Sequence, residues 1–314
     1  MPAAGKLWTR LLTISDTLAG SKPIQLDPGA DGYPAMLGEL RSCPDPLFVL
    51  GDPDVLQLPA IAIVGSRNPT SGGRDNAYRF ARHLARTGFV IVSGLAEGID
   101  AAAHEGALDA DGHTVAVVGH GLDRIYPAAN SSLAERILAD GALVSEYPIG
   151  TPPRRANFPQ RNRIISGLSL GTLVVEAARR SGSLITARTA GEQGREVFAI
   201  PGSIHNPMAK GCHQLIRQGA RLVESADDIL SELGPLVSGL MENLSEATVS
   251  NDTDDQDEDY VRLLNALGFD PQTPEDLAAK TTLTIEQVSS MLLILELQGQ
   301  VESLPGGSFS KLNS

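Results

Sequence analysis

Three short apolar runs decide the fold of this chain: Ile61-Ala-Ile-Val-Gly65, Phe89-Val-Ile-Val-Ser93 and Thr114-Val-Ala-Val-Val118. Stretches with helical periodicity, at about 73–86 and 99–109, lie between them and make a βαβαβ pattern. Continuous apolar strands that alternate with helices are typical of a parallel sheet covered on both faces. The sequence therefore predicts an α/β domain.

The same alternation continues towards the carboxyl terminus. We expect helices at about 131–139 and 182–193, and strands at 142–145, 172–175, 196–200 and 221–223. The prediction is an extended Rossmann-like fold, with a doubly wound and mostly parallel sheet, over residues 57–235. Residues 1–56 are interpreted as an amino-terminal stub and lead-in segment.

A second domain is expected after an acidic linker at 236–259. Residues 239–260 contain eight acidic residues and no Lys or Arg, a composition that cannot bury a core. In 260–314, Thr273 and Thr284 are expected to cap two helices, and 301–304 and 308–312 to form a hairpin. That order predicts a winged helix-turn-helix domain.

The second of these helices, from Thr284 to about Gln298, would be the DNA-reading helix of such a domain. It has no Lys or Arg, and it carries Glu286 and Glu296, which phosphates would repel. Contact with a protein is therefore the favoured role, and the alternative is that the domain only packs on itself.

Composition excludes several classes of protein. Hydrophobic residues make up 42% of the 314 residues and charged residues 20%, which disfavours disorder, collagen and coiled coil. No apolar run approaches the roughly 18 residues of a membrane helix, and the start lacks a signal peptide, so the cytoplasm is the expected location. Cys43 and Cys212 have no metal-binding spacing, so we predict neither a disulfide framework nor a metal site.

The net charge of −13 is unevenly distributed. Residues 154–221 hold eleven Lys and Arg against three acidic residues, and 67–86 hold five Arg against one Asp. Basic clusters in an acidic protein indicate a localised anionic ligand. The alternative is that these arginines lie on solvated helix faces.

Two glycine-rich turns follow the first two strands. Gly65-Ser66-Arg67 lacks the spacing of a dinucleotide-binding turn, so we predict no NAD and no other cofactor. Backbone N–H groups, a hydroxyl and a guanidinium instead suit a phosphate. After the second strand, Asp100 and His104 lie one helical turn apart, which is compatible with an orienting or catalytic pair or with a structural contact.

The segment Asn157–Gly167 carries Phe158, Arg161 and Arg163, and we expect it on a loop rim just before a helical turn. An aromatic face beside cationic groups is typical of sites that bind single-stranded nucleic acid. The alternative is that Phe158 fills the core and the arginines pair with acids. Glu176 is expected to face the Ser/Gly-rich start of the helix at about 182, as a further anion-type site, and Lys210 to add a cation at the same edge.

These motifs together resemble the DNA-processing protein DprA family, also called Smf. The resemblance covers about residues 33–233 and rests on Gly65–Arg67, Ser93–Asp100 with Ala103-His104, Gly121–Pro127, Asn157–Gly167, Val175–Ala177, Ser181–Ala187 and Gly194–Gly202.

The resemblance implies a non-enzymatic protein that binds single-stranded DNA without sequence preference and forms a homodimer. It implies that the protein protects incoming DNA in natural transformation and helps to load the recombinase RecA. Many members have a further helical domain before the segment that resembles Tyr33-Pro34, where about thirty residues stand in this chain. The resemblance places DNA contacts at Ser66, Arg67, Phe158 and Arg161, and also at Arg163 and Lys210.

An alternative function is a nucleotide-binding hydrolase related to the phosphoribohydrolases. Those enzymes place a Gly-Thr-x-x-Glu motif at the nucleotide. Gly171-Thr172-Leu-Val-Val-Glu176 is similar, but it has one extra residue before the acid and lacks the preceding Pro-Gly-Gly. DNA binding without catalysis is therefore the favoured prediction.

Overall fold

The computed structural model describes residues 22–234, 236–237, 262–263, 266–267, 272–281, 283–297, 301–304 and 308–311. The chain divides into two compact units, Met1–Ser238 and Gly239–Ser314, and each is described by itself. The predicted linker at 236–259 lies outside the described residues, apart from 236–237.

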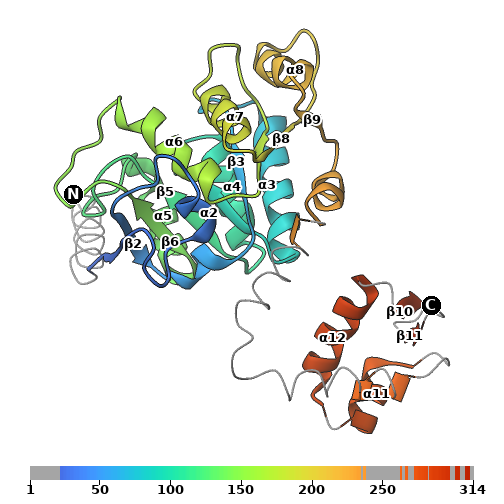
Figure 1. Ribbon diagram of the computed structural model, residues 1–314. Helices are drawn as coiled ribbons and strands as arrows, with labels where there is room; N and C mark the ends of the chain where they lie inside the picture. Colours follow the sequence, from blue (N-terminus) through green and yellow to red (C-terminus); the bar gives the residue numbers. More distant parts are fainter. Residues whose placement is uncertain are drawn as a thin grey trace, which may run out of the picture. The chain divides into compact units, whose positions relative to one another are not determined.

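A nine-stranded sheet, in the order β1-β2-β6-β5-β4-β3-β7-β8-β9, forms the centre of the first unit (Figure 1). All strand pairs from β6 to β9 in this order are parallel, which confirms the predicted doubly wound and mostly parallel fold. The strands are β1 (Ile24–Leu26), β2 (Leu47–Gly51), β3 (Ala60–Val64), β4 (Val90–Ser93), β5 (Thr114–Val117), β6 (Ala142–Ser145), β7 (Gly171–Val174), β8 (Glu196–Ala199) and β9 (Arg221–Leu222).

Two strands of the sheet come from the lead-in segment. β2 pairs antiparallel with β6, and β1 pairs antiparallel with β2. Phe48 lies opposite Ser145, and Leu50 opposite Leu143. The sheet thus begins before residue 57, where the sequence predicted the start of the Rossmann-like domain.

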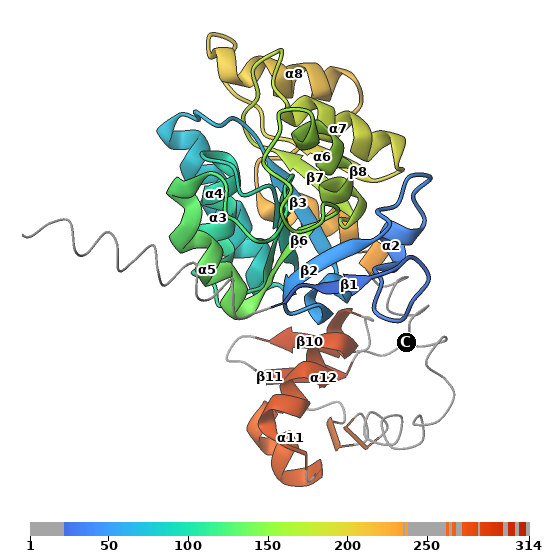
Figure 2. The same ribbon diagram turned by 90° about the vertical axis from the view of Figure 1, so that its left-hand side faces the viewer.

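Helices cover both faces of the sheet (Figure 2). One face carries α3 (Ser71–Arg86), α4 (Ile99–Leu108) and α5 (Ser131–Asp140), and the other carries α2 (Ala35–Gly38), α6 (Asn157–Gly167) and α7 (Ser183–Glu192). The helix α8 (Lys210–Arg217) packs beside α7 and β8. Because both faces are covered, all five residues of β3 are buried, which explains its continuous apolar sequence.

The amino terminus of α3 is determined by the local sequence around Thr70. The Thr70 hydroxyl accepts a hydrogen bond from the Gly73 N–H at 3.0 Å, which satisfies one of the free donors at the helix start. Ala77, Phe80 and Leu84 then follow at helical spacing and are buried. The helix therefore begins immediately after the turn that contains Ser66 and Arg67.

The second unit has the predicted winged helix-turn-helix elements. They are α11 (Pro274–Thr281), α12 (Ile285–Leu297) and an antiparallel hairpin of β10 (Val301–Leu304) and β11 (Ser308–Lys311). Leu277, Val288 and Leu292 are fully buried in its core, whereas Ile294 is 42% exposed on α12. Within the described residues of the two units, no helix has the length and apolarity needed to cross a bilayer.

Candidate nucleic-acid interface

A pocket of about 720 Å³ opens at the carboxyl edge of the parallel strands. The order of the sheet reverses between β3 and β7, and α/β folds bind ligands where such a reversal leaves a crevice. We call this pocket the interface pocket. It is lined by residues from the turn after β3, from the loop after β5, from α6 and the segment before it, from the start of α7 and from the segment before α8. They include Ser66, Arg67, Tyr126, Arg155, Phe158, Arg161, Arg180, Ser181, Ser183 and Met208.

The turn after β3 is held by close backbone packing against the turn that precedes α4. Gly98 has a φ of +87°, and a Cβ atom there would lie 2.4 Å from the Ser66 carbonyl oxygen. The same oxygen accepts a hydrogen bond from the Ile99 N–H at 3.1 Å. Only glycine allows both this backbone conformation and this approach, so Gly98 fixes where Arg67 leaves the turn.

Arg67, Phe158 and Tyr126 form one cluster at the mouth of the pocket. The Arg67 guanidinium carbon lies 5.7 Å from the centroid of the Phe158 ring, within the range of a cation–π contact. The Tyr126 ring lies 5.8 Å from the Phe158 ring, with the two planes inclined by 36°. Tyr126 is 47% exposed, so the cluster presents both charge and an aromatic face to solvent.

Arg161 lies at the floor of the pocket and is only 4% exposed. Its Nη2 donates a hydrogen bond to the Gly94 carbonyl oxygen at 2.8 Å, while its Nε has no partner among the described residues. Burial lowers the pKa of Arg161 to about 10, and the charge of Asp100 opposes this shift. At neutral pH the pocket floor therefore carries a buried positive charge with unused donor capacity.

His104 takes a structural position. It is fully buried, and its Nδ1 lies 2.7 Å from the Thr114 hydroxyl, which itself donates to the Ile91 carbonyl oxygen. The Nδ1 therefore carries the proton and donates. Burial lowers the pKa of His104 to about 3, so the ring is neutral at physiological pH. Of the two interpretations of the Asp100/His104 pair, this geometry favours the structural one.

Glu176 does not face the start of α7, so the sequence interpretation of an anion-type site there is wrong. Its carboxylate accepts hydrogen bonds from the Thr70 N–H at 2.8 Å and from the Thr70 hydroxyl at 2.7 Å. A Cβ atom at Gly73 would lie 2.4 Å from the carboxyl carbon. The carboxylate therefore ties the end of β7 to the start of α3, because a negative charge is stabilised at a helix amino terminus.

The segment Asn157–Gly167 is the helix α6 itself, not a loop rim before a helical turn. Pro159 is compatible with this because it falls in the first turn, where its missing N–H is not needed. Arg163 pairs with Glu146, away from the pocket, and Lys210 begins α8. Of the six predicted contacts, Ser66, Arg67, Phe158 and Arg161 therefore line one pocket, whereas Arg163 and Lys210 do not.

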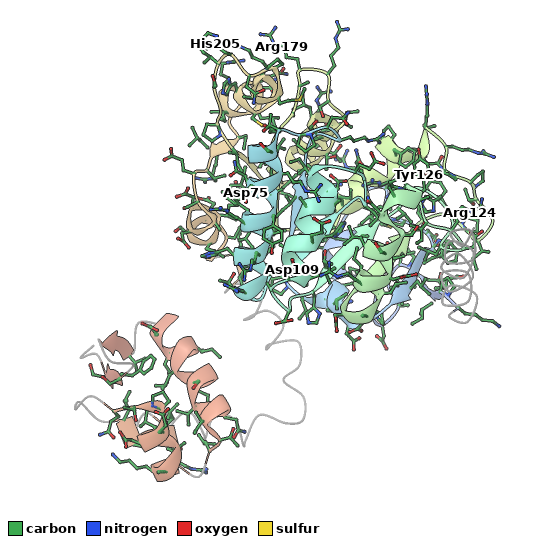
Figure 3. The ribbon with its side chains drawn as sticks, turned by 180° about the vertical axis from the view of Figure 1, so that it is seen from behind. Asp75, Asp109, Arg124, Tyr126, Arg179 and His205 are labelled. Carbon is green, nitrogen blue, oxygen red and sulfur yellow. The ribbon has the colours of Figure 1, made fainter. Side chains whose placement is uncertain are left out.

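The pocket also contains three residues that the sequence analysis did not predict as DNA contacts: Tyr126, Arg155 and Arg180. Figure 3 labels Tyr126, the aromatic residue among the three. Tyr126 follows β5, whose carboxyl end lies at the same sheet edge as those of β3 and β4. An exposed aromatic residue after a third parallel strand was the signal available in the sequence.

Comparison with known proteins gives matches to two family models that together cover most of the chain. The family model of DNA recombination-mediator protein A matches residues 26–234, and that of the DprA winged helix domain matches residues 246–307. Protein Smf of Escherichia coli is 46% identical over 277 residues, which are 88% of this chain and 74% of that protein. DNA processing protein DprA of Streptococcus pneumoniae is 49% identical over 202 residues, which are 64% of this chain and 71% of that protein.

Two solved structures are similar to the first unit. The X-ray structure of DNA processing protein A from Streptococcus pneumoniae has a TM-score of 0.65 and 47% identity, and covers 67% of this chain and 74% of its own. The protein from Helicobacter pylori, described for its single-stranded DNA binding mode, has a TM-score of 0.60 and 31% identity, and covers 65% of this chain and 94% of its own. The resemblance seen in the sequence motifs is confirmed: the chain belongs to the DNA recombination-mediator protein A family, whose relatives are named DprA or Smf.

Proposed function

We propose that this protein binds single-stranded DNA at the interface pocket, without base preference, and so takes part in DNA processing during transformation. The observation that carries the proposal is the placement of the Arg67 guanidinium against the Phe158 ring, beside the exposed Tyr126 and above the buried Arg161. The Helicobacter pylori relative, described for its single-stranded DNA binding, supports the choice of ligand.

The chemistry of the pocket suits a single strand better than a duplex. Aromatic rings such as Phe158 and Tyr126 can stack only on bases that are not enclosed in a double helix. Arg67 and Arg161 offer charge to phosphates, which carry no sequence information. A site built from these groups binds the strand through its backbone and its exposed base faces.

Two of the candidate acid–base groups support a binding role rather than a catalytic one. The carboxylate of Glu176 is occupied by Thr70, and His104 is buried and neutral, so neither group is presented to a ligand as an acid or base. We therefore assign the site a binding role. Arg163 and Lys210, which lie outside the pocket, are proposed as contacts only for DNA that extends beyond it.

The cellular role proposed here is to protect incoming DNA in the cytoplasm and to help to load RecA onto it, as a homodimer. The resemblance to the DprA family supports this role. Loading is tested by measuring RecA assembly on single strands covered by a single-strand-binding protein, with and without the present protein. Assembly at the same rate in both reactions would rule out a loading function.

The binding proposal predicts tighter association with single-stranded DNA than with duplex of the same length, and a steep decrease of affinity with salt. Each phosphate contact contributes about 0.7 to the slope of log affinity against log salt for single strands. Fluorescence anisotropy with single strand, duplex and mononucleotide over a salt series measures both quantities. Equal affinity for duplex, or an affinity that does not change with salt, would refute the proposal.

Deleting residues 240–314 should leave single-strand affinity largely intact or raise it. The segment contains fourteen acidic and three basic residues, so its removal takes away charge that repels DNA. The gain should be larger at low salt, where exposed charges are less screened. The measurement is single-strand affinity of the full and shortened chains over the same salt series.

A second variant separates charge from the winged domain itself. Replacing the six acidic residues of 252–259 by their amides keeps the domain and removes six of the fourteen negative charges, so it should reproduce part of any gain in affinity. A large loss of affinity in a shortened chain that remains folded would instead show that the winged domain binds DNA directly.

A further inference from the structure

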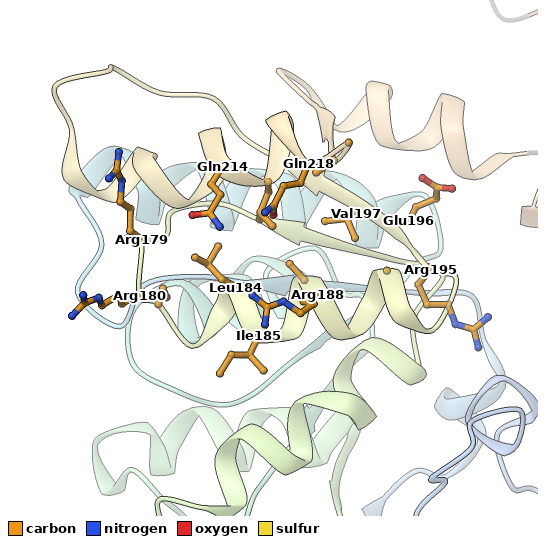
Figure 4. A pocket seen from close by; sticks show the side chains of 16 residues that line it. Arg179, Arg180, Leu184, Ile185, Arg188, Arg195, Glu196, Val197, Gln214 and Gln218 are labelled. Atoms are coloured by element: carbon orange, nitrogen blue, oxygen red, sulfur yellow. The ribbon is translucent and has the colours of Figure 1, made fainter.

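A second pocket, of about 560 Å³, lies between α7 and α8, and the function proposed above assigns it no role. We call it the α7–α8 groove. Gln214 lines it from α8 and Gln218 from the position just after that helix, and Leu184 and Arg188 line it from α7 (Figure 4). Arg179 lines it from the loop that precedes α7.

The groove carries positive charge that the protein does not neutralise. Arg179, Arg180 and Arg188 are exposed, and within the described part of the chain no acidic side chain forms a salt bridge with any of them. Glu196, an acidic residue of the lining, is paired with Arg221 at 3.4 Å. Three unpaired guanidinium groups beside two side-chain amides form a set of donors suited to an anion.

The lining of the groove also indicates which part of a nucleic acid it fits. No aromatic side chain is among its lining residues, in contrast to the interface pocket with Phe158 and Tyr126. Stacking of bases on an aromatic ring is therefore not available in the groove. Arginine forks and amide groups instead suit phosphate and sugar oxygens.

The two pockets adjoin each other. Arg180, Ser181 and Ile185 line both of them, so the pockets meet at the first turn of α7. A strand whose bases stack in the interface pocket would need to pass only this turn to reach the groove. Its backbone would then move from one set of arginines directly to the next.

We propose that the α7–α8 groove binds the phosphate backbone of the same DNA strand where it leaves the interface pocket. The site is then longer than the interface pocket and has two parts: an aromatic part that stacks bases, and an arginine part that neutralises phosphates. This inference rests on the single-strand binding proposed above. It adds the direction in which the DNA strand continues and the residues that bind its phosphates there.

The test is the dependence of affinity on strand length in the full chain with the substitutions Arg179→Ala and Arg188→Ala combined. Arg180 is left in place because it also lines the interface pocket. Oligothymidylates of about 4 to 30 nucleotides span the range from a partly filled to a filled site. For the shortest strands that the wild type binds, the affinity of the variant should equal that of the wild type. For longer strands, the variant should bind more weakly than the wild type.

The size of the loss follows from counterion release. Two lost phosphate contacts lower the salt slope by about 1.4. If the variant and the wild type bind equally at 1 M salt, this change of slope makes the variant bind roughly tenfold more weakly than the wild type at 0.15 M salt. A matched control combines Arg41→Ala with Arg86→Ala, which removes two exposed arginines that line neither pocket. The control should keep the wild-type affinity at every length.

The outcomes separate this inference from the function on which it rests. If the wild type binds single strands but the groove variant matches the control at all lengths, the groove is not part of the path. An equal loss at all lengths would likewise overturn the inference, because the two arginines would then act at the interface pocket. If the wild type binds no single strand at any length, the proposed function itself fails.

Discussion

Replacing Phe158 with alanine should weaken single-strand binding by about 1–3 kcal/mol for each base that stacks on its ring, without a change in the salt slope. The ring carries no charge, so its loss removes stacking and releases no additional counterions. Arg67→Ala should weaken binding and also lower the slope, by about 0.7 for one phosphate contact. Affinity measured over a salt series therefore distinguishes the two roles within one cluster.

Phe158→Leu is the control for this prediction, because leucine fills much of the same space without a π-face. It should lose nearly as much affinity as Phe158→Ala while the protein stays folded. The Arg67 guanidinium lies against the Phe158 ring, so the two residues are not independent. The double variant with Arg67→Ala and Phe158→Ala should therefore lose less binding free energy than the sum of the losses in the two single variants. Wild-type affinity in all folded variants would show that the strand binds elsewhere.

Gly98→Ala should cause the largest loss of stability among single substitutions at the site, about 2–6 kcal/mol. A residue with a side chain is strained at a φ of +87°, which costs of order 1–3 kcal/mol. The new Cβ would also lie 2.4 Å from the Ser66 carbonyl oxygen, and such overpacking typically costs a further 1–3 kcal/mol. Differential scanning calorimetry of the full chain, following the transition of the first unit, measures the loss.

Gly88→Ala separates the two causes. Gly88 has a φ of +89°, but no atom lies within 4 Å of the position that its Cβ would occupy. It should therefore show only the smaller loss that backbone strain produces. Equal losses at Gly88 and Gly98 would mean that the contact between the two turns contributes nothing. Gly98→Ala should also reduce DNA affinity, because the turn that carries Arg67 must move.

The strand and helix pattern of the first unit could be predicted because its strands are buried on both faces. Continuous apolar runs such as 61–64 and 90–92 have few alternative interpretations at that length. The antiparallel strand β2 was missed because it lies in a segment without the βα alternation. Its place in the sheet depends on pairing with β6, nearly a hundred residues further along the chain, which no local pattern reports.

The structure brings the predicted residues on the turn after β3 to the pocket, and it separates the predicted residues on helices. Ser66 and Arg67 follow directly from the position of a turn at a sheet edge. Arg161 and Arg163 look equivalent in the sequence, yet one lies under the pocket and the other pairs with Glu146, because the segment is helical. Glu176 looked free because its partner, Thr70, lies 106 residues away in the chain.

The contact between Gly94 and Arg161 also constrains how the family can vary. A Cβ atom at residue 94 would lie 2.0 Å from the Arg161 guanidinium, so any side chain there would collide with the group that supplies charge to the pocket floor. A side chain at residue 94 would therefore displace the Arg161 guanidinium from the Gly94 carbonyl oxygen, to which it donates a hydrogen bond. A homologue with a side chain in place of Gly94 should therefore hold its buried cation in a different position.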